Sequence, residues 1–176
     1  NSAAGKVYVF HGSADGIHGT AVSPAWSAVG EGPANYFGMS VAGAGDVNGD
    51  GYSDIIVGAY RANSNKGKAY VFHGSASGVT GTAATPAWST SGEQESDAFG
   101  GTVASAGDVN GDGYGDVAVA APDYAINNTG KVYVFYGSTN GLSGTAASPA
   151  WSVVGGNADD AFGRSAVGAG EVNGDG

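Results

Sequence analysis

The chain has 176 residues, of which 34 are glycine, 41% are hydrophobic and 12% are charged, and its formal net charge is −10. Glycine is poor in helix interiors and no segment keeps a 3.6-residue apolar period, so the composition excludes long helices, while the hydrophobic content excludes a disordered chain. The negative charge argues against nucleic acid and anionic membranes as partners, and there is neither a membrane-spanning apolar run nor any cysteine for disulfide or thiolate chemistry.

Short β-branched and aromatic segments predict an all-β chain with glycine-rich turns. In the central part we expect strands at Ser40–Gly45, Asp54–Ala59 and Lys68–His73, and a fourth around Trp88–Ser91. The second of these is almost continuously apolar, as is typical of a strand covered on both faces. Four antiparallel strands of this kind make one blade of a β-propeller.

This unit recurs along the chain at spacings of 62 or 63 residues. A period of this length with several short strands per unit is typical of a propeller. We therefore expect one β-propeller domain over 1–176, divided into the outer strands of a blade (1–30), two complete blades (31–92 and 93–155) and the first strand of another (156–176). The recurring segments are GKVYVF or GKAYVF at Gly5, Gly67 and Gly130, PAWS at Pro24, Pro86 and Pro149, and Phe-Gly at Phe37, Phe99 and Phe162.

An acidic loop of the form Asp-x-Asn-x-Asp-Gly-x-x-Asp separates the first two predicted strands of each complete unit. Asp46, Asn48, Asp50 and Asp54 offer side-chain oxygens at alternate positions, and Tyr52 offers its backbone carbonyl. Ca²⁺ takes six to eight oxygen ligands, and crowded carboxylates repel one another unless a cation lies among them. We therefore predict a calcium site here and a second at Asp108, Asn110, Asp112, Tyr114 and Asp116.

A third, weaker copy of the loop comprises Glu171, Asn173 and Asp175, and could bind only if a partner segment supplied the missing oxygens. None of the loops is an EF-hand, because position 12 is Val57 or Val119 instead of a bidentate Glu. Mg²⁺ fits less well, since it demands strict octahedral geometry, and soft-ligand metals lack Cys or His nearby in sequence. The alternative is an Asp- and Gly-rich turn that needs no metal.

The order Phe37-Gly38, AGDVNGDGYSD, Gly58-Ala59-Tyr60 and GKAYVF resembles the FG-GAP repeat of the integrin α-subunit β-propeller. The next repeat departs from it slightly, with Ala120-Ala121-Pro122 where the family has Gly-Ala-Pro. The resemblance implies a propeller with calcium in the hairpin between the first two strands of a blade. It also implies an extracellular or cell-surface location and a role in adhesion or recognition.

Three blades are too few to close a propeller, which typically has about four to eight. We therefore expect either a homo-oligomer, with a dimer giving about six blades, or the remainder of a longer propeller chain. Because the chain begins at Asn1 without a signal peptide, we also expect a processed form or an excised fragment.

Several other residues recur without forming a catalytic constellation. We expect Trp26, Trp88 and Trp151 to fill the same packing position between blades, with sugar stacking as the alternative. We interpret His11 and His73 as surface aromatics, because no nucleophile or carboxylate is placed beside them in sequence. The chain is therefore not expected to be an enzyme.

The leading interpretation is a calcium-binding β-propeller scaffold for adhesion or recognition of a protein or glycan ligand, with calcium mainly structural. The alternatives are an accessory module of a secreted enzyme, a propeller lectin, and an engineered or duplicated repeat protein without a natural ligand. Tyr36 and Met39 differ from Ala98 and Gly101 at the matching positions of the next repeat, so a ligand surface could be specialised there.

Overall fold

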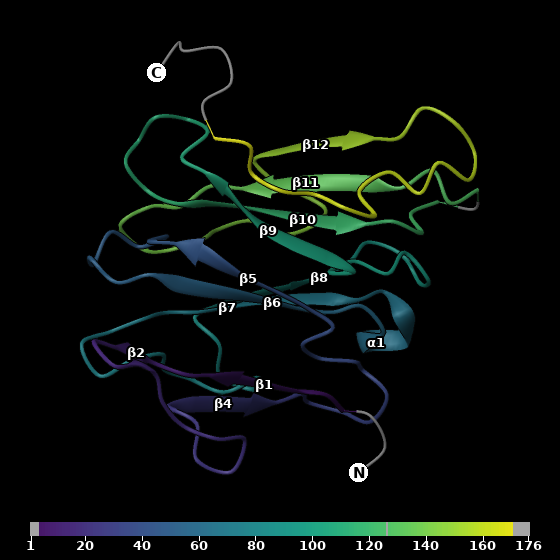
Figure 1. Cartoon of the computed structure of the whole chain (residues 1–176). Coiled ribbons are helices and arrows are strands. Elements are labelled where there is room, and N and C mark those ends of the chain that lie inside the picture. The colour runs from purple at the N-terminus through teal and green to yellow at the C-terminus, as the bar shows by residue number, and fades with distance from the viewer. Residues whose placement is uncertain (1–3, 126, 171–176) are drawn as a thin grey trace.

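A stack of antiparallel sheets, arranged in chain order, makes up the molecule (Figure 1). The computed structural model describes residues 4–125 and 127–170. It shows the predicted all-β fold, with two four-stranded sheets that correspond to propeller blades. No helix within these residues is long and apolar enough to cross a membrane.

Each complete sheet follows the chain from one edge to the other, so that every strand pairs with its sequence neighbour. The first sheet has the order β5-β6-β7-β8 and the second has β9-β10-β11-β12. The strands of the first are β5 (Ser40–Gly45), β6 (Asp54–Ala59), β7 (Lys68–Phe72) and β8 (Trp88–Ser91). Those of the second are β9 (Thr102–Gly107), β10 (Asp116–Ala121), β11 (Lys131–Phe135) and β12 (Trp151–Val154).

The N-terminal part of the stack contains two strand pairs and no complete sheet. The strand β1 (Lys6–Val9) pairs with β4 (Trp26–Val29) in the same antiparallel register that joins the third and fourth strands of the complete sheets. A short hairpin, β2 (Gly12–Ser13) and β3 (Gly16–Ile17), extends from it. One short helical turn, α1 (Ala62–Asn65), lies between β6 and β7.

The strand predictions are confirmed for β5, β6 and β8, whose bounds match. The third strand is one residue shorter than predicted, because β7 ends at Phe72 and leaves His73 at the start of the following loop. The turn α1 and the hairpin β2–β3 were not predicted. Residues 164–170 form no strand, although the backbone at Gly168 lies close to Ser105 in β9.

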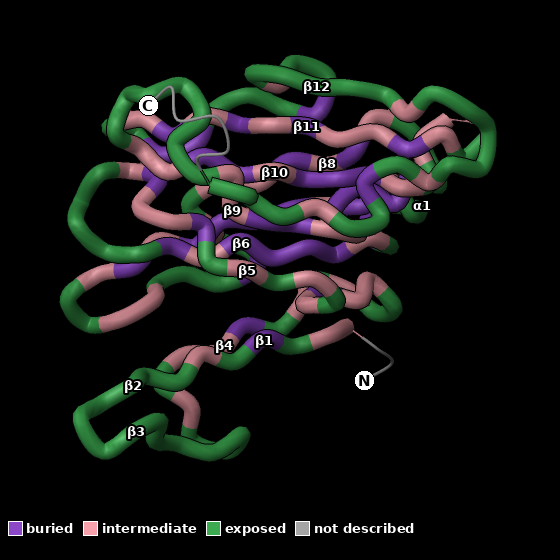
Figure 2. Tube along the Cα trace, turned by 45° about the horizontal axis from the view of Figure 1, so that its top comes forward, coloured by how far each residue is buried: buried purple, intermediate pink, exposed green. Residues whose placement is uncertain are grey.

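Buried residues lie along the strands in the interior of the stack (Figure 2), and their apolar side chains form the core. In β6 every residue except Ile55 is buried, since neighbouring sheets cover both faces. Phe99 from the second Phe-Gly pair lies edge-on to Tyr133, with ring centroids 5.1 Å apart, and is fully buried. Its backbone passes so close to Gly67, where φ is +79°, that a Cβ there would lie 1.9 Å from the Phe99 carbonyl oxygen. These contacts explain why Phe-Gly and Gly-Lys recur together.

Trp26 and Trp88 join one sheet to the next, as predicted, whereas Trp151 is 50% exposed. The Trp26 indole Nε1 donates to the Gly81 carbonyl at 3.2 Å, and its ring lies 5.0 Å from that of Phe72. Trp88 makes the equivalent bond to Gly144 at 3.3 Å. Both indoles are therefore engaged in packing between sheets.

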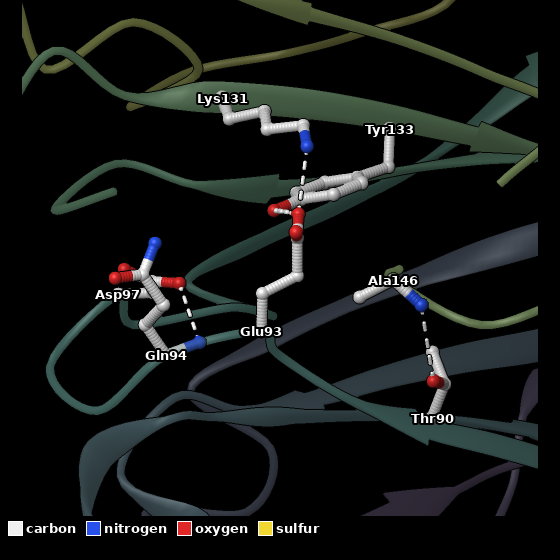
Figure 3. A network of polar contacts seen from close by, with 7 residues as sticks. All are labelled: Thr90, Glu93, Gln94, Asp97, Lys131, Tyr133 and Ala146. Carbon is white, nitrogen blue, oxygen red and sulfur yellow. Dashed lines mark hydrogen bonds and ion pairs between the residues drawn. The ribbon is translucent and has the colours of Figure 1, made fainter. Parts of the chain in front are cut away.

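A partly buried polar contact, absent from the sequence predictions, occurs twice beside the core, and Figure 3 shows the copy at Glu93. Glu93 follows β8 and reaches into the second sheet, where Oε1 accepts hydrogen bonds from Lys131 Nζ at 2.7 Å and from the Tyr133 hydroxyl at 2.9 Å. Glu31 makes the same pair of contacts with Lys68 and Tyr70 in the first sheet. This contact, which we name the glutamate latch, ties each loop to the third strand of the following sheet.

The glutamate latch affects the acidity of its members. Burial alone would raise the pKa of Glu31, but hydrogen bonds from Lys68 and Tyr70 outweigh it and hold that pKa below its ordinary value. Burial and the neighbouring glutamate raise the pKa of the tyrosine hydroxyls far above the ordinary value. The tyrosines therefore stay protonated and act as hydrogen-bond donors.

Candidate metal centre

The first acidic loop connects β5 to β6 and is closed by its own hydrogen bonds. Asp46 Oδ1 accepts the backbone N–H groups of Gly49 at 2.7 Å and Asp50 at 3.1 Å, and its Oδ2 accepts that of Gly51 at 2.7 Å. Asn48 Nδ2 donates to Asp50 Oδ2 at 2.9 Å. The structure thus brings three of the predicted ligand side chains, Asp46, Asn48 and Asp50, into one compact turn.

Asp54 stands at the base of this loop, as the first residue of β6, and is fully buried. Its two carboxylate oxygens accept the backbone N–H groups of Gly74 at 2.8 Å and Val47 at 2.9 Å. Burial raises the pKa of Asp54 above its ordinary value, while these two bonds act in the opposite direction. The carboxylate therefore ties the loop to the end of β7, and its charge is incompletely compensated.

The second acidic loop, between β9 and β10, repeats this geometry. Asp108 accepts three backbone N–H groups at 2.7–3.1 Å, and Asn110 donates to Asp112 at 2.9 Å. Asp116 is fully buried, accepts the N–H groups of Val109 and Gly137 at 2.8 Å each, and has its pKa raised by burial. The two loops, whose sequences differ only at Ser53 and Gly115, thus adopt the same conformation.

The two loops touch each other. The Gly115 N–H of the second loop donates to the Asp46 carbonyl at 2.8 Å. The Tyr114 ring covers Gly49, where φ is +72° and an added Cβ would lie 2.6 Å from Tyr114 Cε1. Gly49 is therefore required both by its backbone conformation and by its neighbour. Tyr114, whose backbone carbonyl is a predicted ligand of the second site, therefore also packs its ring on the first loop.

His73 lies beside the first loop, a placement that sequence reasoning missed. Its Nδ1 is 3.2 Å from Asn48 Nδ2, and its Nε2 is buried with no partner among the described residues. The interpretation as a surface aromatic is wrong for His73, because the loop after β7 folds back toward Asn48 and the next sheet packs on the ring near Gly141. The spacing of 25 residues gave no local signal for this contact.

The donor set of the two loops fits a hard divalent cation, because every predicted ligand atom is an oxygen. Each nine-residue loop contains three carboxylates. The two ion pairs found among the described residues, Lys68–Glu31 and Lys131–Glu93, lie outside the loops. A cation would compensate the buried charge of Asp54 and Asp116.

The side chains themselves bond the loop backbone and do not converge on one point. Within residues 4–125 and 127–170, no three acidic, histidine or cysteine side chains are grouped as a metal would hold them. Glu171, Asn173 and Asp175 of the third loop lie outside the described residues. The ligand assignments therefore stay predictions, supported by the donor chemistry and by the repeated loop conformation.

Comparison with known proteins identifies the repeats. The FG-GAP repeat family model matches residues 37–72 and 99–135. The chain is 41% identical to mouse (Mus musculus) integrin alpha-IIb over 122 residues, which cover 65% of this chain and 12% of that protein. It is 40% identical to integrin alpha-3 of Cricetulus griseus over 111 residues, 61% of this chain and 10% of the relative.

Integrin alpha-6 of Gallus gallus is 37% identical over 126 residues, again 65% of this chain and 10% of the relative. The chain thus spans about a tenth of the length of these proteins. Each match to the repeat family runs from a Phe-Gly pair to the end of the third strand and includes one complete acidic loop. The chain therefore contains two FG-GAP repeats, at residues 37–72 and 99–135, and is homologous to integrin α subunits over more than half of its length.

Proposed function

We propose that the chain is a calcium-binding propeller module of an extracellular protein that serves adhesion or recognition. The observation that carries this proposal is the pair of acidic loops, which share one conformation and bury the carboxylates of Asp54 and Asp116 without a cationic side chain in either loop. The homology to integrin α subunits supports the extracellular setting and a non-catalytic role.

Calcium would be held by the oxygens of the two loops and would act mainly on stability. Its charge would compensate the three carboxylates that each loop carries, and its ligands would fix the hairpins β5–β6 and β9–β10. Because such a site requires the folded loop, binding stabilises the native state by mass action. The loops therefore serve as stabilising elements of a scaffold whose ligand binds elsewhere.

A surface suited to recognition lies at the ends of the strands opposite the acidic loops. The Arg61 guanidinium stands 5.0 Å from the ring centroid of Tyr36 and 5.4 Å from that of Tyr60. A pocket lined by Tyr60, Arg61, Ser96 and Asp123 adjoins this cluster. The matching positions of the next repeat are Ala98, Pro122 and Asp123, so the repeats differ here while their acidic loops agree.

The lectin interpretation is weakened by the tryptophans. Trp26 and Trp88 each donate to a carbonyl of the following sheet and pack on a buried phenylalanine, so these two indoles are engaged between sheets, whereas Trp151 is 50% exposed. A protein ligand at the Arg61 cluster is therefore the better-supported form of recognition.

Thermal unfolding with calcium and with EDTA tests the proposed function. At free calcium about a hundredfold above the dissociation constant, each site contributes about 2.7 kcal/mol. For a chain of this size that corresponds to about 5–11 °C in melting temperature. We expect EDTA to lower the melting temperature of the wild type, and Asp50→Ala or Asp112→Ala to reduce this fall, whereas Asp15→Ala, which removes an exposed acid outside the loops, should not. An EDTA-insensitive wild type would refute the proposal.

A further inference from the structure

A single peptide group of the second acidic loop connects it to the first. The carbonyl of this group belongs to Tyr114 and is a predicted ligand of the second calcium site. The N–H at the other end of the same trans peptide bond belongs to Gly115 and donates to the Asp46 carbonyl at 2.8 Å. A peptide group is planar and rigid, so its carbonyl and its N–H move together. One rigid group therefore carries a predicted ligand atom of the second site and a hydrogen bond to the first loop.

A second connection joins the buried carboxylates at the bases of the two loops. Asp116 Oδ1 accepts the Gly137 N–H at 2.8 Å, and the next residue, Ser138, donates its N–H to the Val47 carbonyl at 3.1 Å. Val47 is fully buried and donates its own N–H to Asp54 Oδ2 at 2.9 Å. Main-chain hydrogen bonds thus lead from a predicted ligand of the second site to a predicted ligand of the first.

The two loops approach each other so closely that the second loop needs a glycine at the contact. A Cβ added at Gly115 would lie 2.9 Å from the Ala44 carbonyl oxygen and 3.2 Å from the Asp46 backbone nitrogen. Ser53 stands at the matching position of the first loop. The tips of both loops, residues 49–53 and 107–113, are exposed, so they have few packing contacts to keep them ordered. The contact at Gly115 is therefore a main route by which order in one loop supports order in the other.

We propose that the two acidic loops bind calcium cooperatively, with the Tyr114–Gly115 peptide as the principal link between the sites. This inference rests on the proposed function, since it concerns how the two calcium sites act on each other. A peptide group whose carbonyl binds a cation is polarised and donates a stronger hydrogen bond from its N–H. A second loop fixed in this way also holds Asp46 in place, so ordering the first loop costs less. By linkage, an occupied first site raises the affinity of the second by the same factor.

The size of the coupling follows from the number of contacts. Coupling between two sites typically changes affinity by about 5- to 150-fold. Because a few main-chain hydrogen bonds make up the link, we expect a factor of about five to ten, at the low end of that range. Charge acts in the opposite direction, since two bound cations repel each other, and salt at about 0.15 M screens this repulsion over about 8 Å. Repulsion between the ions therefore cannot produce cooperative binding.

Calorimetric titration of the full chain with calcium at this salt concentration measures the coupling. The coupling factor is the overall association constant for two ions divided by the product of the constants of the single-site variants Asp50→Ala and Asp112→Ala. It is determined in three backgrounds: the wild type, Gly115→Ser and Ser53→Gly. Gly115→Ser forces the loops apart and keeps every predicted ligand. Ser53→Gly is the matched control, because it makes the reverse exchange at the same position of the first loop and leaves the link intact.

The single-site variants lose the same charges in every background, so differences between the coupling factors isolate the link. We expect the factor to be about five- to tenfold larger in the wild type and in Ser53→Gly than in Gly115→Ser. Equal factors in the wild type and Gly115→Ser, or a factor that falls in Ser53→Gly, would overturn the coupling and leave the two calcium sites in place. A wild type that binds no calcium would overturn the proposed function as well.

Hydrogen exchange of the Gly115 N–H gives a second measurement that does not depend on Gly115→Ser. In Asp112→Ala only the first site remains, whereas the Gly115 N–H belongs to the second loop. We expect calcium to slow the exchange of this N–H about fivefold relative to EDTA, as read by nuclear magnetic resonance, because the ordered first loop holds its acceptor, Asp46. The variant that combines Asp50→Ala with Asp112→Ala should show no such effect. Exchange that calcium leaves unchanged in Asp112→Ala would overturn the proposal.

Discussion

Gly49 and Gly111 occupy the same position in the two acidic loops, which share one conformation. Replacing each of them by alanine therefore compares the cost of the same side chain in two different surroundings. Both glycines have φ of +72°, a conformation that costs an L-residue about 1–2 kcal/mol. At Gly111 the added Cβ meets nothing within 4 Å, so this strain is the whole expected cost. At Gly49 the Cβ would stand 2.6 Å from Tyr114 Cε1, about 1 Å inside a favourable carbon–carbon distance.

Overpacking of this kind costs about 1–3 kcal/mol, and the lower half of that range applies because Tyr114 is only partly buried and its ring can shift. Gly49→Ala should therefore destabilise the chain by about 1–2 kcal/mol more than Gly111→Ala. In thermal unfolding the difference amounts to about 2–8 °C.

Thermal and urea unfolding of the two single variants, each alone and combined with Tyr114→Ala, measure this difference. Removing the Tyr114 ring should abolish it, because only the shared backbone strain then remains. Equal destabilisation by Gly49→Ala and Gly111→Ala in the wild-type background would refute the contact between the loops. A difference that persists without the Tyr114 ring would show that another neighbour causes it.

Two further substitutions test the polar contacts between sheets. Burial raises the pKa of Asp97 above its ordinary value, so this group makes the wild type lose stability as pH rises through that pKa. Asp97→Asn introduces the residue found at the matching Asn35 and should lose less stability over the same pH range, because only the contributions of Asp54 and Asp116 then remain. Urea unfolding from pH 4 to 7 would contradict this if both proteins behaved alike. Glu93→Gln keeps a hydrogen-bond acceptor but removes the charge facing Lys131, and because the pair is partly exposed we expect a loss of only about 1 kcal/mol in the free energy of unfolding. Glu93→Gln in a Lys131→Met background should cost less, and an equal cost in both backgrounds would rule out the ion pair.

The fold follows from the sequence where the information is local and repeated. The apolar run of β6 and the alternating residues of β5 predict strands whose bounds match, because a strand covered by neighbouring sheets must be apolar along its length. Recurrence of the same segments at 62 or 63 residues fixes the blade as the unit. The acidic loop lies between β5 and β6, as its sequence position requires.

What the sequence did not predict depends on contacts between residues far apart in the chain. Glu93 and Lys131 are 38 residues apart and form the glutamate latch across two sheets, with no motif that marks either residue as a partner. His73 meets Asn48 only because the loop after β7 folds back on the hairpin. The direction of the Asp54 carboxylate, which bonds backbone N–H groups at the loop base, is likewise set by tertiary packing.

Isothermal titration calorimetry of the full chain with calcium tests the central claim most directly. The account predicts two strong sites per chain, one of which is lost in Asp50→Ala and the other in Asp112→Ala, while Asp15→Ala retains both. Absence of calcium binding, or an unchanged number of sites in Asp50→Ala and in Asp112→Ala, would contradict the assignment of the two loops as calcium sites.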